Sequence, residues 1–286
     1  MSLYRQPNNW SCGPFALKHA LVMLGRFVDE DNISRIAGAH WWSGTDDIKL
    51  AKAARAFGCE LKFIRRKKAD RAKRELLTHL RRGYPALLCV YDWNHWITVV
   101  NAERGKYVVI DSREQPVVSV LTWSQLKNIW VYRDEDPDDV GETMTLFDLH
   151  PVIPKFRVKT KAKFSLKRVR YLRRPENRTF GTHWDEYFED LLTICKPRTP
   201  RSANFISMGE FLRRHYEMLV GQVSHWHGGV KENRIGKVLK NMQFVADTYG
   251  LVIDKDDVRR AIAAIACNLS IWACSQYGVS SVYGKN

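Results

Sequence analysis

Residues 12–25 of this 286-residue chain read CGPFALKHALVMLG, and the fold is built outward from this stretch. Its apolar residues recur at helical spacing, and Gly25 is a typical residue just past a helix end, so we predict a helix with an almost entirely apolar face. A second helix is predicted over 46–57. It begins with two aspartates, whose negative charge favours a helix N-terminus, and it ends at Gly58. The chain therefore opens with helices.

Strand-like runs dominate the next part of the chain. A short strand at 59–64 and an amphipathic helix at 70–82, rich in Arg and Lys, come first. Four apolar, β-branched runs follow, punctuated by turn-forming residues: 86–91, 96–102, 107–111 and 117–121. Helices followed by consecutive strands are typical of the α+β class, so we predict α+β, with N-terminal helices packed on an antiparallel sheet.

The charge is distributed unevenly and indicates two domains. Residues 1–150 contain 22 Lys and Arg against 19 Asp and Glu, whereas residues 151–286 contain 24 against 12. Residues 136–154 belong to an acidic, turn-rich stretch that we interpret as a linker. We therefore predict a first domain over 1–135 and a basic, mostly α-helical domain over 155–286, with helices at about 184–195, 207–226, 231–249 and 255–277.

The basic domain opens with a run of cations. From Lys155 to Lys163 every second residue is Lys or Arg, which predicts a half-exposed strand. Between Lys155 and Arg178 only Glu176 opposes the positive charge. A charge run is most often a solvated face, but this one is also a candidate surface for nucleic acid or another polyanion, bound mainly by electrostatics.

A candidate catalytic constellation spans the first domain. Cys12 begins the first helix, where the positive end of the helix dipole favours a thiolate. His95 heads one strand and Asp111 closes the next, so adjacent antiparallel strands bring them to one end of the sheet. We predict that Cys12 is the nucleophile, His95 the general base and Asp111 the residue that orients the imidazole. Gln6 would stabilise the oxyanion together with the backbone N–H of Cys12.

These residues resemble those of a known family. Gln6 followed by Cys12-Gly13, an apolar helix, Gly44-Thr45 leading into LAKAARAFG at 50–58, and the HWITVV and VVID strands are similar, in spacing and order, to the papain-like cysteine peptidases that remove double-glycine leaders from bacteriocins. The resemblance covers roughly residues 4–133. It implies a papain-like fold and a Cys–His–Asp thiol peptidase with a glutamine in the oxyanion hole, acting on a peptide or protein.

The sequence departs from the family's pattern at three positions near these residues. Ser11 replaces the common Asp before the nucleophile, Asn94 replaces the common Gly before the histidine, and Ser112 replaces a frequent Pro after the aspartate. The first two put leader specificity in question. No nucleotide-binding GxxxxGK[ST] segment is present, so this sequence is not that of an export transporter.

Several alternatives stay open at this stage. A lone Cys is more often a buried core residue than a nucleophile, and we expect Cys59 and Cys89 to be core. His183, His225 and His227 form no convincing metal set, so we expect neither metal nor cofactor. Deamidation or transamidation would use the same three residues as peptide hydrolysis. The runner-up function is a peptidase-like scaffold whose basic C-terminal half binds nucleic acid or an acidic protein.

Bulk properties bound the remaining possibilities. No apolar run approaches the roughly 18 residues of a membrane-spanning helix, and the N-terminus lacks the apolar core of a secretory signal. The six cysteines include no CxxC pair, which argues against a disulfide framework or a zinc ribbon. We therefore expect a cytoplasmic protein without a membrane span. His40-Trp41-Trp42 could rim the peptidase cleft or simply pack.

Overall fold

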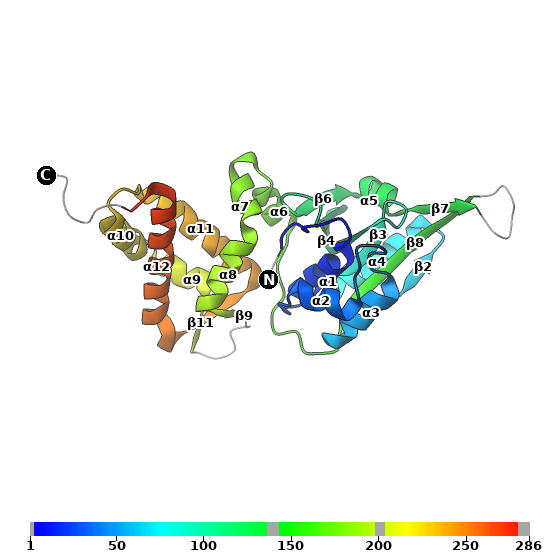
Figure 1. Cartoon of the computed structure of the whole chain (residues 1–286), viewed down its shortest axis with the longest axis horizontal. Coiled ribbons are helices and arrows are strands. Elements are labelled where there is room, and N and C mark those ends of the chain that lie inside the picture. Colours follow the sequence, from blue (N-terminus) through cyan, green and yellow to red (C-terminus); the bar gives the residue numbers. More distant parts are fainter. Residues whose placement is uncertain (1–2, 136–142, 198–203, 280–286) are drawn as a thin grey trace. The chain divides into compact units, whose positions relative to one another are not determined.

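The structure is a computed structural model that describes residues 3–135, 143–197 and 204–279 (Figure 1). The chain divides into two compact units. Unit 1 is Met1–Val158 with Phe164–Asp185, and unit 2 is Lys159–Lys163 with Glu186–Asn286. The predicted helices and strands of the first half are present, with ends shifted by a few residues.

Unit 1 combines helices with an antiparallel sheet, as the sequence predicts. Its helices are α1 (Cys12–Met23), α2 (Glu30–Ala37), α3 (Asp47–Ala56), α4 (Ala69–Arg81), α5 (Trp123–Trp130), α6 (Leu166–Leu172), the 3-10 turn η1 (Pro175–Asn177) and α7 (Arg178–Thr182). Its strands are β1 (Cys59–Leu61), β2 (Ile64–Arg66), β3 (Ala86–Val90), β4 (His95–Glu103), β5 (Lys106–Ile110), β6 (Val118–Thr122), β7 (Tyr132–Glu135) and β8 (Thr143–Pro154). The expected single strand over 59–64 is two strands, β1 and β2.

The sheet follows the order β1-β8-β3-β4-β5-β6, and β2 and β7 also pair with β8. All of these pairings are antiparallel. Because β4 and β5 are joined by a tight turn at Arg104-Gly105, the beginning of β4 and the end of β5 lie at the same edge of the sheet. This edge carries His95 and Asp111.

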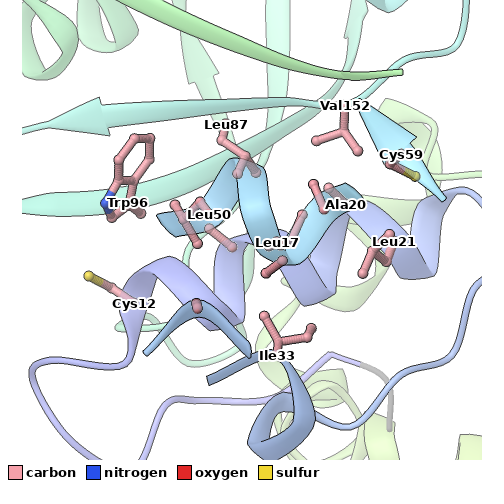
Figure 2. Packing of buried hydrophobic residues seen from close by; sticks show 14 of the residues in the cluster. Cys12, Leu17, Ala20, Leu21, Ile33, Leu50, Cys59, Leu87, Trp96 and Val152 are labelled. Atoms are coloured by element: carbon pink, nitrogen blue, oxygen red, sulfur yellow. The ribbon is translucent and has the colours of Figure 1, made fainter. Parts of the chain in front are cut away.

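Helices cover both faces of the sheet. One apolar cluster joins α1, α2 and α3 to the face that presents Leu87 and Cys89. A second joins α4 and α5 to the face that presents Leu88 and Val90. Successive residues of β3 thus belong to different clusters, because side chains alternate across a strand. In the first cluster, Cys12 lies at the N-terminal end of α1, on the same side of the cluster as Trp96 (Figure 2).

The acidic-linker prediction is wrong for residues 143–154. They form β8, which pairs in turn with β7, β2 and β1 and also with β3. Residues 136–142 lie outside the described part of the chain. The expected boundaries at 135 and 155 shift accordingly, because unit 1 includes β8 and, after a short excursion, the segment 164–185.

The half-exposed strand expected from Lys155 to Lys163 is not formed. This stretch pairs with no strand among the described residues, yet its alternating cations are exposed and the residues between them are half-buried. Phe156 and Val158 pack against the first cluster, and residues 159–163 belong to unit 2. The period-two pattern therefore marks an extended chain with one packed side.

Unit 2 is mostly helical, as predicted, and also contains a small sheet that the sequence did not suggest. The elements from the segment around the unit boundary to the C-terminus are α8 (Trp184–Ile194), β9 (Lys196–Pro197), β10 (Phe205–Ser207), α9 (Met208–Arg214), α10 (Tyr216–His227), α11 (Glu232–Tyr249), β11 (Leu251–Asp254), the 3-10 turn η2 (Lys255–Asp257) and α12 (Val258–Tyr277). The strand order is β10-β11-β9, antiparallel. Within the described ranges no helix is both long and apolar enough to cross a bilayer.

Candidate active site

Cys12 is the first residue of α1 and is 7% exposed. Asn8 Oδ1 accepts hydrogen bonds from the backbone N–H groups of Trp10 and Ser11 (3.2 and 3.0 Å), which closes the turn that leads into the helix. Ser11 occupies the N-cap position but makes no side-chain cap. The N–H groups at this end of α1 are therefore left without a side-chain cap beside the thiol.

Gly13 lies in a tightly packed place. A Cβ on this residue would lie 3.0 Å from Cβ of Thr45 and 3.4 Å from the Trp96 ring. The Trp96 indole N–H donates to the carbonyl of Thr45 at 3.0 Å. The close contact thus fixes the start of α1 between the loop before α3 and the start of β4.

His95 and Asp111 meet at the edge of the sheet, as predicted. His95 Nε2 lies 2.7 Å from Asp111 Oδ1, and the same oxygen accepts the backbone N–H of Arg113 at 2.9 Å. The His95 side chain is fully buried and Asp111 is 8% exposed. Because Asp111 occupies Nε2, the other ring nitrogen, Nδ1, is left for the thiol. It has no hydrogen-bond partner among the described groups, the thiol included.

The thiol of Cys12 and the imidazole of His95 shift each other's titration. Burial raises the pKa of Cys12, but its interaction with the His95 imidazole, the backbone N–H of Trp96 and the charges of His95 and Arg113 outweigh it, so the net pKa is lowered. Burial lowers the pKa of His95, but Asp111 and Cys12 outweigh that effect and the net pKa is raised. Both shifts favour a thiolate beside an imidazolium.

The pKa of Asp111 is lowered as well. Burial raises it, whereas the hydrogen bond and charge of His95, followed by the backbone N–H and charge of Arg113, lower it by more. Asp111 is therefore ionised over the whole range in which His95 titrates. An ionised carboxylate on one ring nitrogen, together with a thiol that shifts the titration of the same ring, is the arrangement that general-base activation of a nucleophile requires.

Gln6 lies next to these residues through Ser112, which directly follows Asp111. Gln6 is 7% exposed, and its side-chain oxygen accepts a hydrogen bond from the hydroxyl of Ser112. Its backbone N–H donates to the Ser112 carbonyl at 2.9 Å, and its side-chain amide donates to the carbonyl of Asn8 at 2.6 Å. An amide group has two N–H donors, so one remains for an oxyanion.

The turn before His95 is a feature that the sequence did not reveal. Tyr91, Asp92 and Trp93 all have positive φ angles of 55°, 53° and 61°, and each left-handed non-glycine residue costs about 1–2 kcal/mol. The side-chain amide of Asn94 donates to the carbonyls of Tyr91 and Asp92 (2.9 and 3.2 Å) and so stabilises the turn. The departure from Gly at position 94 thus has a structural role, which only the turn geometry explains.

Aromatic side chains of the same turn pack against the imidazole and against neighbouring strands. The Tyr91 ring stacks on His95 with centroids 6.4 Å apart. The Trp93 ring stacks on the Tyr132 ring, with 3.6 Å between the ring centroids. The guanidinium of Arg65, a residue of β2, lies 5.2 Å from the centroid of the Trp93 ring. These contacts fix the backbone on which His95 is presented.

Trp41 and Trp42 are 66% and 78% exposed, so ordinary packing does not explain them. They lie in a tight loop closed by backbone hydrogen bonds between His40 and Gly44 in both directions (3.3 and 2.8 Å). The next residue, Thr45, lies beside Gly13. The loop thus presents two large apolar rings a few residues from the point that contacts the start of α1.

The other sequence candidates lie apart from this site or in the core. Cys59 and Cys89 are buried as expected, and burial raises their pKa values to about 11 and about 12. His225 is exposed, whereas His227 is buried and binds the carbonyl of Gly278. Among the described residues, the groups that could converge on a metal are the carboxylates of residues 29–31 at the start of α2, and none of these histidines belongs to that group.

Solved structures similar to this chain include peptidase domains of transporters. A double glycine motif protease from an AMS/PCAT transporter, in complex with the leader peptide, is 16% identical, covers 52% of this chain and 90% of its own, and has a TM-score of 0.38. The peptidase domain of Streptococcus ComA, a bifunctional ABC transporter involved in a quorum-sensing pathway, is 16% identical, with coverages of 53% and 97% and a TM-score of 0.39.

The peptidase domain of Streptococcus mutans ComA is 15% identical, with coverages of 51% and 97% and a TM-score of 0.34. Each of these three structures is similar to about half of this chain. No family model matches the sequence, and no curated protein matches it.

Proposed function

We propose that unit 1 is a thiol hydrolase that cleaves a peptide or protein segment. The observation that carries this proposal is the imidazole of His95, bound to Asp111 at 2.7 Å through one nitrogen while it lowers the pKa of the Cys12 thiol beside the other. A thiol placed in this way at a helix start has the features of an activated nucleophile rather than of a core cysteine.

In the proposed reaction the Cys12 thiolate attacks the carbonyl carbon of the scissile bond. The His95 imidazolium then donates its proton to the leaving amine, which departs and leaves a thioester on Cys12. A water molecule, deprotonated by His95, hydrolyses the thioester and restores the thiol. Asp111 holds the imidazole in the required tautomer throughout.

Negative charge develops on the carbonyl oxygen twice in this reaction, once when the thioester forms and once when it is hydrolysed. The free N–H of the Gln6 amide and the backbone N–H of Cys12 are its proposed donors. Loss of one such donor typically slows turnover by about 100- to 1,000-fold. The exposed rings of Trp41 and Trp42 are the proposed contacts for apolar side chains of the substrate, because they lie in the loop that adjoins the start of α1.

Mapping of thiol reactivity tests this function. The full chain is treated with a low concentration of iodoacetamide at near-neutral pH, and alkylation of each cysteine is followed by peptide mass spectrometry. We expect Cys12 to react faster than the exposed Cys267, although Cys12 is only 7% exposed. The ratio of the Cys12 alkylation rate to the Cys267 alkylation rate should fall strongly in His95→Ala, because the imidazole is the group that lowers the thiol pKa.

Reaction of Cys12 that is slower than that of Cys267, and unchanged in His95→Ala, would rule out an activated nucleophile. The peptidase-like scaffold would then be the better description of unit 1. Cleavage of casein by the unaltered chain and by Cys12→Ala is then compared as a test of peptidase activity. If Cys12 is selectively reactive but neither protein cleaves casein, the site is a thiol enzyme of narrower specificity or of amide-transfer chemistry.

A further inference from the structure

A basic cavity of about 770 Å³ lies in unit 1 beside β2 and the beginning of α4. In Figure 1, β2 lies beside β8, on the side of the sheet opposite to β6. Six cations line the cavity: Arg65, Arg66, Lys67, Lys68, Arg71 and Arg74. Its other lining residues are Glu75 and Thr78, so no apolar side chain contributes to the walls.

Two of the six cations are neutralised within the protein. Arg65 makes a bidentate pair with Asp148 on β8, with both N–O distances 2.7 Å. Arg66 binds Glu75 at 2.5 Å, which uses the one carboxylate of the lining. These pairs hold β2 against β8 and α4, so they fix the positions of Arg65, Arg66 and Glu75 in the cavity wall.

The remaining four cations, Lys67, Lys68, Arg71 and Arg74, are exposed and have no ion pair with any carboxylate in the described part of the chain. Arg71 and Arg74 are three residues apart on α4 and therefore share one face of the helix. Lys73, which lies between them in the sequence, does not line the cavity, and its ammonium group lies 5.1 Å from the centroid of the Trp123 ring. The convergence on the cavity is therefore selective.

The beginning of α4 adds further donors. Lys68 occupies the N-cap position of this 13-residue helix without a side-chain cap, so the first-turn N–H groups have no side-chain partner there. Asp70 in the first turn is exposed and does not line the cavity. The Thr78 hydroxyl donates to the carbonyl of Arg74. The cavity thus offers an excess of donors and positive charge, and its single carboxylate is already used.

We propose that this cavity is a binding site for the phosphate groups of an anionic ligand. Guanidinium groups bind phosphate oxygens in pairs, and an uncapped helix start favours the same anion. A peptide ligand would also need pockets for its apolar side chains, and no apolar residue lines the walls. The shared chemistry of the ligand is phosphate, whether in a nucleic-acid strand or in a free polyphosphate.

The site differs from the polyanion surface expected at Lys155–Arg178. In that stretch the cations alternate along an extended chain up to Lys163 and then continue through α6 and η1, and the stretch is divided between the two units. Here four cations from a loop and one helix face converge on one concavity, which is a more specific arrangement than a charged run.

Binding of a fluorescein-labelled oligothymidylate strand to the full chain, measured by anisotropy over a salt series, tests the proposal. If all four cations contact phosphates of a single strand, the slope of log K against log salt should be roughly −2.8, and affinity should fall about 50-fold between 50 and 200 mM salt. In Arg71→Gln/Arg74→Gln, which removes two contacts, the slope should become shallower by about 1.4.

The matched control is Lys52→Gln/Arg55→Gln. These two exposed cations are also three residues apart on a helix of unit 1, α3, and do not line the cavity. The control removes the same net charge and should leave the slope unchanged. Because all four substituted side chains are exposed, thermal melts should coincide with that of the unaltered chain.

Competition assigns the ligand chemistry. Displacement of the oligothymidylate by tripolyphosphate but not by an oligoglutamate peptide of matched charge supports a phosphate site that a strand can fill. Binding of tripolyphosphate without binding of the oligothymidylate supports the same site with a free polyphosphate as its ligand. Equal competition by the oligoglutamate peptide would overturn the phosphate assignment. Three outcomes would overturn the site. The α4 and α3 variants could change the slope equally, or neither phosphate probe could bind. Binding could also be lost only in Lys159→Gln/Lys161→Gln.

Discussion

Two cysteines of unit 1 have the same exposure but opposite titration behaviour. Cys12 and Cys89 are each 7% exposed. Burial raises the pKa of Cys89 to about 12, whereas the pKa of Cys12 is lowered despite its burial. The difference at Cys12 is its interaction with the imidazole of His95, with help from the backbone N–H of Trp96. At the residue scale, the chemistry of this site therefore depends on one contact between α1 and β4.

The first prediction concerns the pH dependence of Cys12 alkylation. Because its pKa is lowered, the thiolate should form at a pH below the usual thiol range near 8.5. In His95→Ala the burial remains while the imidazole is lost, so the midpoint should move upward, above that range. Alkylation rates of the Cys12 peptide across pH 5–10 provide the measurement. Identical midpoints in both proteins would contradict the assigned cause.

A second prediction concerns Ser112 as a positioning residue. Ser112→Ala removes the hydroxyl that donates to the Gln6 side-chain oxygen, so the Gln6 amide should lose its fixed orientation. We expect kcat for a p-nitrophenyl ester to fall about tenfold, a fraction of the loss typical for an oxyanion donor, with KM little changed. Ser112→Thr, which keeps the hydroxyl, should restore most of the activity.

The double variant Gln6→Ala/Ser112→Ala separates this role from a general structural one. If Ser112 acts through Gln6, the double variant should be no slower than Gln6→Ala alone, because the two losses are not additive within one network. Additive losses would show that Ser112 acts on something else.

At the scale of elements, α1 is unusual because every residue from Cys12 to Met23 is buried. The sheet covers one side, while α2 and α3 contribute to the same apolar cluster. The Thr98 hydroxyl on β4 donates to the carbonyl of Ala16 at 2.7 Å and so ties the helix to the strand that begins with His95. This packing sets the position of Cys12 relative to His95, and it also encloses His19 completely.

His19 therefore gives a third prediction. Burial, followed by the charge of Lys18, lowers its pKa to about 3, and its ring nitrogens have no partner among the described groups. The unfolded chain binds this proton near pH 6.5, so stability is present above that pH and is lost as pH falls toward 3. His19→Leu should remove up to about 1.4 kcal/mol per pH unit from the slope of the unfolding free energy between pH 4 and 6.

Urea unfolding of both proteins at several pH values measures this difference. Other groups, such as Asp111, contribute equally to both slopes, so the comparison isolates His19. Parallel pH profiles for His19→Leu and the unaltered chain would contradict a buried, neutral histidine.

At the scale of the whole molecule, the units follow the sheet rather than the composition of the chain. β8 lies between β1 and β3 and also pairs with β2 and β7, although its sequence follows an acidic, turn-rich stretch. The segment 164–185 also belongs to unit 1: Asn101 on β4 donates to the carbonyl of Phe164, and Arg173 donates to the carbonyl of Val118 on β6.

A fourth prediction follows from this arrangement. A chain ending at residue 135, the boundary expected from composition, lacks β8 and should fail to fold cooperatively, because four strands lose their pairing partner. A chain ending at residue 185 retains unit 1 and should unfold in one cooperative transition, with Cys12 still more reactive than Cys89. Circular dichroism in a urea gradient compares them. Equally cooperative unfolding of the shorter chain would contradict a central role for β8.

Local sequence patterns were enough to predict most of the elements around the candidate site and the residues that it would use. Apolar periodicity located α1, α3 and the strands from β3 to β6, because each pattern reflects a face that must be buried. The positions of Cys12, His95 and Asp111 at element ends also followed from the sequence, since an antiparallel pair places the start of one strand beside the end of the next.

Only the tertiary structure decided the features that depend on distant partners. The pairing partners of β8 lie up to 95 positions earlier in the chain, as for Cys59 and Pro154, so its own composition gave no adequate signal. Ser112 looked like a neutral departure until Gln6, 106 residues away, accepted its hydrogen bond. Asn94 had no evident role until a left-handed turn required its amide. Long-range pairing and backbone geometry are set by the whole chain, and a local pattern contains neither.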